Sequence, residues 1–230
     1  LPGIIKEASA CEISKKSPLI WTVEDHNNQN VLFGFNEKGE LIKEITITNV
    51  ENNDWEDLTS DDEGNLYIGD FGNNDNDREN LAIYKINAAD LTKNEAKAES
   101  IVQFYYPEQT EIPSKKKNRI FDVESFFIHN NKFYLFTKNR SSKFDGTTVL
   151  YEVENNPVER LPAKMISSFV TCEEFNHCAV TSADISPNKD KVAILSSDKV
   201  WVFSNWKDND FFSGNVEIIE LNHHTQKEGL

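Results

Sequence analysis

The sequence has few cysteines, little basic charge and no long apolar segment. Its three cysteines are too few for the disulfide framework of a small secreted domain. Its 24 lysines and arginines face 39 aspartates and glutamates, and the formal charge of −15 argues against binding to nucleic-acid phosphates or anionic lipid surfaces. No apolar run approaches the roughly 20 residues that a transmembrane helix needs. The G-x-S-x-G and H-E-x-x-H motifs are also absent, so the sequence gives no sign of serine-hydrolase or zincin chemistry.

What the sequence does contain is a repeated phrase: an acidic or small polar pair, a short strand, a Gly/Asn/Asp turn and another strand. Clear copies read DWEDLTSDDEGNLYIGD at 54–70, FDVESFFIHNNKFYLFTKN at 121–139 and TSADISPNKDKVAILSSD at 181–198. A degenerate first copy occupies 7–25, and QKEGL at 226–230 resembles the opening of a fifth. The spacing of about 40 to 70 residues fits a four-stranded β-propeller blade with variable outer loops.

Each copy is expected to form four strands, because short runs rich in β-branched and aromatic residues alternate with turn residues. The expected strands are 9–13, 19–23, 31–35 and 41–48 in the first copy, 55–59, 65–69, 81–86 and 100–105 in the second, 123–128, 132–137, 148–153 and 165–169 in the third, and 183–186, 192–196, 200–203 and 216–221 in the fourth. The one helix signal, at 88–98, indicates a single helical turn in a loop. The sequence therefore predicts an all-β propeller.

Four segments together resemble a known kind of protein: DWEDLTSDDEGNLYIGDFGNN, FDVESFF with FYLFTKN, VTSADIS and the terminal QKEG. They are similar to an uncharacterised family of bacterial secreted β-propellers, related in style to the TolB-like, SdiA-regulated and phytase-esterase-like six-bladed groups. The resemblance covers nearly the whole chain. It implies a propeller fold and a secreted, periplasmic or lipid-anchored cell-surface location.

In that family pattern, two or more strands follow QKEG. We therefore expect residues 1–230 to be a single propeller domain that carries four blades and one leading strand and lacks its closing strands. A complete ring would have five or six blades. An open ring leaves an unpaired strand edge, which closed propellers avoid.

The first strand of each blade lines the central channel of a propeller, and residues two apart in a strand share a face. This predicts channel-facing pairs, of which the Ser182 pair can be offset by one residue: Glu7 with Ser9, Asp54 with Glu56, Asp122 with Glu124, Ser182 with Asp184, and Gln226 with Glu228. So many carboxylates around one axis require raised pKa values or a bound cation.

Ca²⁺ is the candidate cation, because it takes about six to eight oxygen ligands. The candidate metal ligands are Asp54, Glu56, Asp122 and Glu124. In the alternative interpretation, the channel carboxylates form ion pairs with Arg78, Lys138 and Arg140 and need no metal.

A second acidic segment, GDFGNNDNDREN at 69–80, offers closely spaced oxygens that resemble a calcium loop. Asparagine and aspartate are also common turn residues, and the interpretation we favour is a long hairpin that an ion pair of Arg78 with Asp70 holds in place. His26 follows the expected second strand of the first copy, where it could lie at the channel mouth.

Cys172 and Cys178 can close a small ring in an oxidising compartment, with Cys11 as a buried strand thiol. In the alternative, all three cysteines are reduced and inert. A zinc site built from Cys172, His177 and Cys178 is sterically poor.

These patterns lead to two functional hypotheses. The leading one is a monomeric binding or scaffold propeller for a small molecule, glycan or protein, with a structural calcium as candidate cofactor. The competing one is a metal-dependent hydrolase of the lactonase or phosphoesterase kind, in which the four candidate metal ligands bind the cation or act as base. An enzyme predicts a solvent-open cation at the channel mouth, whereas a scaffold predicts carboxylates paired with arginine and lysine.

Overall fold

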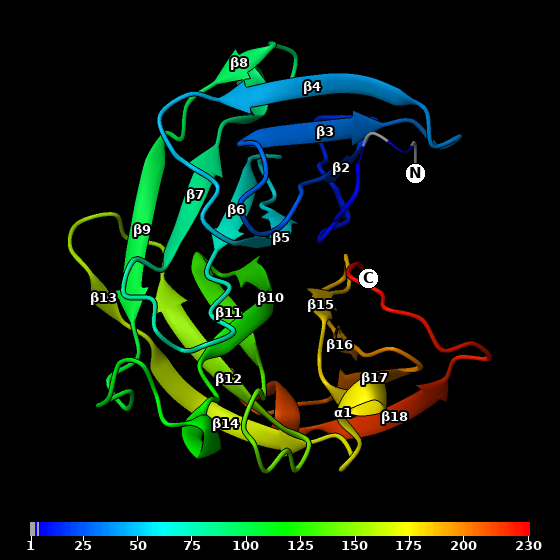
Figure 1. Ribbon diagram of the computed structural model, residues 1–230. Helices are drawn as coiled ribbons and strands as arrows, with labels where there is room; N and C mark the ends of the chain where they lie inside the picture. Colours follow the sequence, from blue (N-terminus) through cyan, green and yellow to red (C-terminus); the bar gives the residue numbers. More distant parts are fainter. Residues whose placement is uncertain (1–2, 4) are drawn as a thin grey trace.

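Four small sheets stand around a common axis, which makes the chain a four-bladed β-propeller (Figure 1). The computed structural model describes residue 3 and residues 5–230. The predicted all-β fold class is confirmed, whereas the expectation of five or six blades in a complete ring stays a prediction.

The strands of each blade follow one another outward from the axis in chain order. Blade 1 contains β1 (Glu12–Ile13), β2 (Ile20–Thr22), β3 (Val31–Phe35) and β4 (Leu41–Ile47). Blade 2 contains β5 (Trp55–Ser60), β6 (Leu66–Asp70), β7 (Ala82–Ile86) and β9 (Ser100–Tyr105). Blade 3 contains β10 (Asp122–His129), β11 (Lys132–Lys138), β12 (Thr147–Glu154) and β14 (Lys164–Val170). Blade 4 contains β15 (Ser182–Ile185), β16 (Lys191–Leu195), β17 (Lys199–Ser204) and β18 (Asn215–Glu220).

The predicted strands match these elements closely, and the largest departure is the first strand of blade 1. There the chain pairs through an isolated bridge between Ala8 and Glu24 and then through β1. Short helical segments lie in the loops: η1 (Ala88–Asp90), η2 (Lys116–Asn118), α1 (Phe175–Cys178) and η3 (Phe211–Ser213). The first of these is the single turn that the sequence predicts, whereas α1 lies between the expected strands 165–169 and 183–186, where no helix is predicted.

Two very short strands connect neighbouring blades at their outer edges. β8 (Glu95–Ala96) leaves blade 2 and pairs parallel with β4 of blade 1. β13 (Leu161–Pro162) leaves blade 3 in the same way and pairs with β9 of blade 2. Sequence patterns did not predict them, because a two-residue strand carries no alternation signal.

The core lies between adjacent blades and is rich in aromatic side chains. Trp21 and Trp55 pack between blades 1 and 2, and Trp201 packs between blades 3 and 4. Each of the three is at most 1% exposed. Phe71 and Phe126 join blades 2 and 3, with ring centroids 5.1 Å apart. Burying one such side chain contributes about 2 to 3 kcal/mol, so these contacts hold the inner strands in place around the axis.

The segment after β18 differs from the sequence-based prediction. Residues 226–230 form no strand, although the repeat pattern predicts the first strand of another blade there. The segment instead continues from blade 4 toward blade 1, where Thr181 Oγ1 donates to the carbonyl of Lys227 at 2.5 Å and Gly229 packs against Cys11. Figure 1 shows the C-terminus between these two blades.

Among the helices of the described residues, none has the length and apolar character needed to cross a membrane.

Candidate functional site

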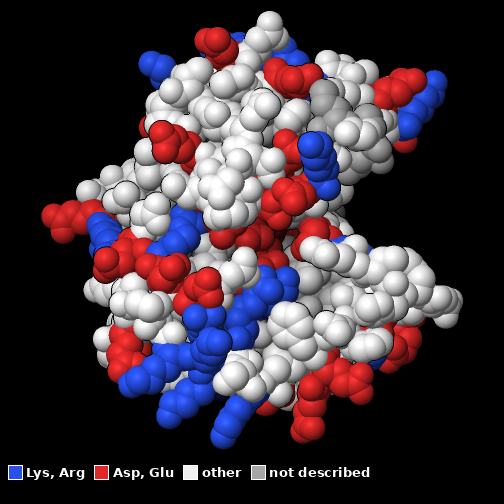
Figure 2. Space-filling view, in the orientation of Figure 1, with Lys and Arg blue, Asp and Glu red and all other residues white. Residues whose placement is uncertain are grey.

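A polar cavity of about 680 Å³ opens where the inner strands of the four blades meet. Six carboxylic acids but only three lysines and arginines line it, so its interior is acidic. In Figure 2 red side chains gather in the central hollow, with blue ones along its lower edge. The predicted channel residues that line this cavity are Glu7, Ser9, Asp54, Glu56, Glu124, Gln226 and Glu228.

Three predicted channel residues lie elsewhere. Asp122 is fully buried behind the cavity wall, and Ser182 is buried outside the lining. Asp184 lines a separate pocket of about 460 Å³ together with Cys11 and Glu12. The repeat pattern does not reveal several lining residues, because their segments lie outside the first strands: Lys6, Asp25, Asn74, Phe175 and Asn176.

Glu56 and Glu124 occupy the same position in two equivalent strands. The pairing of β5 with β6 shifts register between Trp55 and Asp57, so Glu56 is an extra residue in a β-bulge. The pairing of β10 with β11 shifts between Val123 and Ser125, which makes Glu124 the extra residue there. A bulge re-aims the extra side chain, and here both carboxyl groups point toward the axis.

Glu124 belongs to a closed ion-pair network. Arg140 Nη2 donates to one oxygen of Glu124 at 2.5 Å, and Lys138 Nζ donates to the other at 2.9 Å. Arg140 Nε donates to Asp122 at 2.6 Å, and the backbone N–H of Asn73 donates to the second oxygen of Asp122 at 2.6 Å. Burial and the Glu124 charge raise the pKa of Asp122 to about 7, and Arg140 opposes that rise.

Glu56 has no such partners. It is 8% exposed, and within residues 5–230 no hydrogen bond or ion pair reaches its carboxyl group. Asp54 is 5% exposed, and its carboxylate lies 3.5 Å from Nδ1 of His26. Gly72 brings the two acids together, because a methyl group there would overlap carboxylate atoms of both Asp54 and Glu56.

Burial is the main cause that raises the pKa of Glu56 well above its usual value, and the charges of Glu124, Asp122 and Asp54 add to it. Burial also raises the pKa of Asp54, and His26 opposes that shift. An unpaired carboxyl group in this position favours holding a proton or receiving a cationic donor.

Burial and neighbouring negative charges also raise the pKa values of acids elsewhere in the cavity. Burial, followed by the charge of Glu7, raises the pKa of Asp25 to about 6. Burial, followed by the charge of Glu124, raises the pKa of Glu228 to about 7. The cavity therefore gains negative charge as the pH rises through the neutral range.

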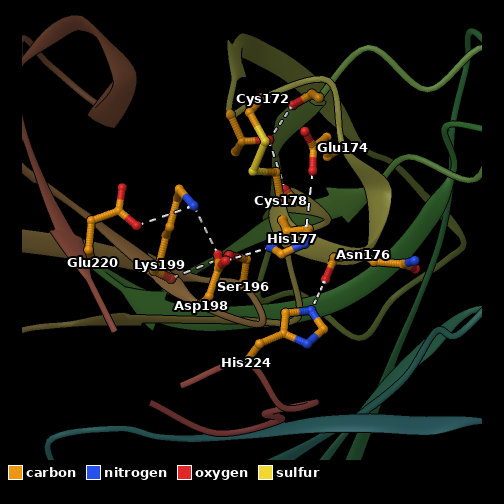
Figure 3. Close-up of a disulfide and its surroundings, with 12 residues drawn as sticks. Cys172, Glu174, Asn176, His177, Cys178, Ser196, Asp198, Lys199, Glu220 and His224 are labelled. Carbon is orange, nitrogen blue, oxygen red and sulfur yellow. Dashed lines mark hydrogen bonds and ion pairs between the residues drawn. A yellow bond between two sulfur atoms is a disulfide. The ribbon is translucent and has the colours of Figure 1, made fainter. Parts of the chain in front are cut away.

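Helix α1 forms the opposite wall of the cavity, and a disulfide between Cys172 and Cys178 encloses it (Figure 3). Phe175 and Asn176 face the cavity from inside this ring. His177 Nδ1 lies 2.6 Å from a carboxylate oxygen of Asp198, which ties the helix to blade 4. These contacts hold the wall in place and leave the ring of Phe175 partly exposed.

His224 supports the helix from the C-terminal segment. Its Nε2 lies 2.9 Å from the carbonyl oxygen of Asn176, and its ring packs against that of His177 with centroids 4.6 Å apart. Cys11 is exposed and lies just before β1, so the expectation of a buried strand thiol is wrong.

The loop at 69–80 is the predicted hairpin. Arg78 donates to Asp70 at 2.7 Å and to the carbonyl of Gly72 at 2.6 Å. The amide groups of Asn73 and Asn76 are occupied by backbone hydrogen bonds within the loop and to Phe121. In the described part of the chain, no three His, Cys, Asp or Glu side chains are grouped so that they could hold a metal ion.

No protein-family model and no curated protein matches the chain. Solved structures do match in fold. A gluconolactonase from Xanthomonas campestris has a TM-score of 0.50 and 9% identity, and the match covers 94% of this chain and 62% of that one. A protein of unknown function from Bacteroides caccae has a TM-score of 0.48 and 11% identity, covering 94% and 61%.

A putative 6-phosphogluconolactonase from Bacteroides uniformis has a TM-score of 0.41 and 14% identity, covering 92% of this chain and 55% of that one. The chain thus spans between 55% and 62% of the length of these three proteins. At such identities the likeness concerns the propeller fold alone.

Proposed function

We propose that this chain is a binding propeller that takes up a small polar ligand in the cavity between its blades. One observation carries the proposal: Glu56 is 8% exposed, lines the cavity and has no partner among the described residues. Leaving a buried polar group unpaired costs about 1 to 3 kcal/mol, and a ligand that donates to this group would recover that cost.

The ion-pair network around Arg140 also supports a binding propeller over an enzyme. Asp122 and Glu124, two of the four candidate calcium ligands, are engaged by Arg140 and Lys138. Calcium is a candidate occupant of the remaining pair, Asp54 and Glu56. The disulfide favours an oxidising compartment, in keeping with a secreted, periplasmic or cell-surface protein similar to the TolB-like group.

A hydrolase of the lactonase kind is the second candidate. The observation that favours it is the adjacent pair Asp54 and Glu56, because two neighbouring carboxyl groups with raised pKa can serve as base and acid. The gluconolactonase from X. campestris has the same fold. A phosphoesterase is less favoured, since the acidic cavity repels a phosphate ester unless a bound cation offsets the charge.

Calorimetry on the metal-stripped protein tests the two candidates, first with Ca²⁺ and then with glucono-δ-lactone and glucose. Calcium binding that disappears in Glu56→Gln, together with lactone hydrolysis that requires calcium, would establish the hydrolase. Binding of calcium or a small molecule without turnover is the result we expect for a binding propeller. A cavity that binds no cation, sugar, lactone or amine, in wild type and variant alike, would overturn the proposal.

A further inference from the structure

We propose that the ligand of this cavity is an organic cation whose ammonium group lies between Asp54 and Glu56. This inference rests on the proposed function of the cavity and names its ligand class. It follows from the number of free acceptors, from the burial of Glu56 and from the composition of the opposite wall.

The number of free acceptors matches an ammonium better than a metal ion. Calcium takes about six to eight oxygen ligands. Arg140 and Lys138 engage Asp122 and Glu124, which leaves Asp54 and Glu56 as the adjacent carboxyl groups without a lysine or arginine partner. An ammonium group has three donors, and two carboxylates with one further oxygen satisfy it. This agrees with the finding that the described residues offer no metal-binding group of three.

The burial of Glu56 favours a cationic occupant when that acid is charged. The residue is 8% exposed, lines the cavity and receives no side-chain or backbone donor from residues 5–230. Gly72, which has no side chain, leaves the space in which the carboxyl groups of Glu56 and Asp54 lie next to each other. Two adjacent negative charges away from bulk water attract a cation strongly, because the low local dielectric strengthens the interaction.

The rest of the cavity provides room for an organic group. Its volume of about 680 Å³ lies in the range of small-molecule sites and far exceeds the roughly 30 Å³ that one water molecule occupies. Phe175 is 37% exposed and faces the cavity, and the methyl groups of Ala8 and Ala179 add apolar surface. A ligand with an ammonium group at one end and an apolar body at the other fits these two walls.

Charged neighbours make the binding depend on pH. The titratable and charged groups that face Glu56 or Asp54 are Asp25, His26, Asp70, Arg78, Asp122, Glu124 and Lys138. The net effect of burial and these neighbours raises the pKa of both acids, so each tends to hold a proton in the free protein. An ammonium binds the ionised acids and releases that proton. Affinity should therefore rise with pH until the acids are ionised without the ligand.

Calorimetry on the wild-type chain with matched pairs of probes tests the inference. The probes are benzylamine against benzyl alcohol and 1,4-diaminobutane against 1,4-butanediol, which differ in charge but hardly in shape. At pH 8 we expect at least one amine to bind at least tenfold more tightly than its alcohol. At pH 6 its affinity should be roughly tenfold lower, and titration in two buffers of different ionisation enthalpy should show proton release.

Two variants test whether the amine binds at Glu56. Glu56→Gln should lower amine affinity by roughly 10- to 100-fold, because a charge-assisted hydrogen bond is lost. Asp62→Asn, an exposed carboxylate outside the cavity, should leave it unchanged. Circular dichroism verifies that both variants are folded.

The outcomes separate this inference from the proposed function. If the alcohols, glucose or calcium bind but the amines do not bind more tightly than their alcohols, the cavity is a binding site and the cation inference is wrong. Amine binding that Glu56→Gln leaves unchanged also overturns the inference, because the ammonium then lies elsewhere. If none of these compounds binds, both proposals fail.

Discussion

Two corners of the cavity have the same backbone and opposite electrostatics. The blade 2 corner contains Asp54 and Glu56 beside Gly72, and its carboxyl groups have no lysine or arginine partner in the described chain. The blade 3 corner consists of Asp122, Glu124, Lys138 and Arg140, in which every carboxylate is paired. The carboxylates of the blade 3 corner are neutralised by the protein's own lysine and arginine, whereas those of the blade 2 corner are available to a ligand.

The difference in charge between the two corners originates at the end of the strand next to the inner one, β6 in blade 2 and β11 in blade 3. Trp55 pairs with Asp70 in blade 2 as Val123 pairs with Thr137 in blade 3, so DFGN at 70–73 corresponds to TKNR at 137–140. Lys138 and Arg140 therefore correspond to Phe71 and Asn73. The Phe71 side chain is fully buried in the core, and the Asn73 amide accepts backbone hydrogen bonds from its own loop.

Removing the guanidinium of the blade 3 corner should have the largest effect. Arg140→Met leaves Asp122 and Glu124 buried beside each other with Lys138 alone to offset them. Breaking a buried ion pair in this way costs about 3 to 5 kcal/mol, and we expect a loss of this size in the free energy of unfolding at pH 7. Urea denaturation followed by tryptophan fluorescence measures it.

Lys15→Met is the control, because Lys15 and its partner Asp62 are both well exposed. An exposed pair contributes less than about 1 kcal/mol. Equal losses in the two variants would show that the blade 3 corner adds no more stability than a surface ion pair.

A Glu→Gln substitution should have opposite effects on the stability of the free protein in the two corners. At pH 8, Glu124→Gln should destabilise the free protein by about 1 to 3 kcal/mol, because Arg140 and Lys138 lose a charged acceptor. Glu56→Gln should stabilise it by about 1 kcal/mol, because the amide removes the cost of a buried negative charge without a partner. Parallel urea titrations measure the free energy of unfolding of the two variants. A lower free energy of unfolding in both would mean that Glu56 has a stabilising partner.

Much of the fold followed from the sequence, for a clear reason. Strands such as 123–128 are short runs rich in β-branched and aromatic residues between Asn, Asp and Gly turns, and each blade repeats that pattern. The acidic pairs at 54–56 and 122–124 could be placed near the axis because period-two alternation fixes which face a side chain occupies.

That pattern could not predict that the acids at 122–124 form ion pairs while those at 54–56 have no lysine or arginine partner. A β-bulge, which points Glu56 and Glu124 toward the axis, leaves no mark in a hydrophobicity pattern. The choice of partner depends on strand register, and one residue of slip would place Lys138 on the other face. Wall residues such as Phe175 come from the four-residue helix α1, which is too short to carry a periodic pattern. Asp184 was misplaced because its strand lacks the bulge that β5 and β10 share.

The pH dependence of stability should distinguish the open corner from the paired one. The pKa values of Asp54 and Glu56 are raised on folding, so above about pH 4.5 these two groups bind more protons in the folded protein than in the unfolded chain. Stability from these groups is therefore present below their unfolded pKa and is lost as the pH rises. Asp25 and Glu228, with pKa values of about 6 and about 7, place much of this loss between pH 5 and 8.

We expect the free energy of unfolding of wild type to fall over that window. Glu56→Gln should make the slope shallower by about 1 kcal/mol per pH unit at most, since one group contributes no more than this order. Urea titrations at four pH values measure the slopes. Identical slopes for wild type and variant would mean that Glu56 titrates at its ordinary pKa.

The smallest expected effect concerns the contact between the blade 3 corner and the cavity wall. The guanidinium of Arg140 lies 5.9 Å from the ring centroid of Phe175, and Phe144 packs edge-on against the same ring with centroids 5.3 Å apart. A partly exposed cation–π contact contributes about 0.5 to 1 kcal/mol, so Phe175→Leu should cost about that amount. Phe144→Leu keeps the Arg140 contact and serves as control. In a double-mutant cycle with Arg140→Met, the coupling free energy isolates the contact itself. A coupling near zero would mean that the wall and the paired corner are energetically independent, and a ligand that displaces Phe175 would then leave the ion-pair network unchanged.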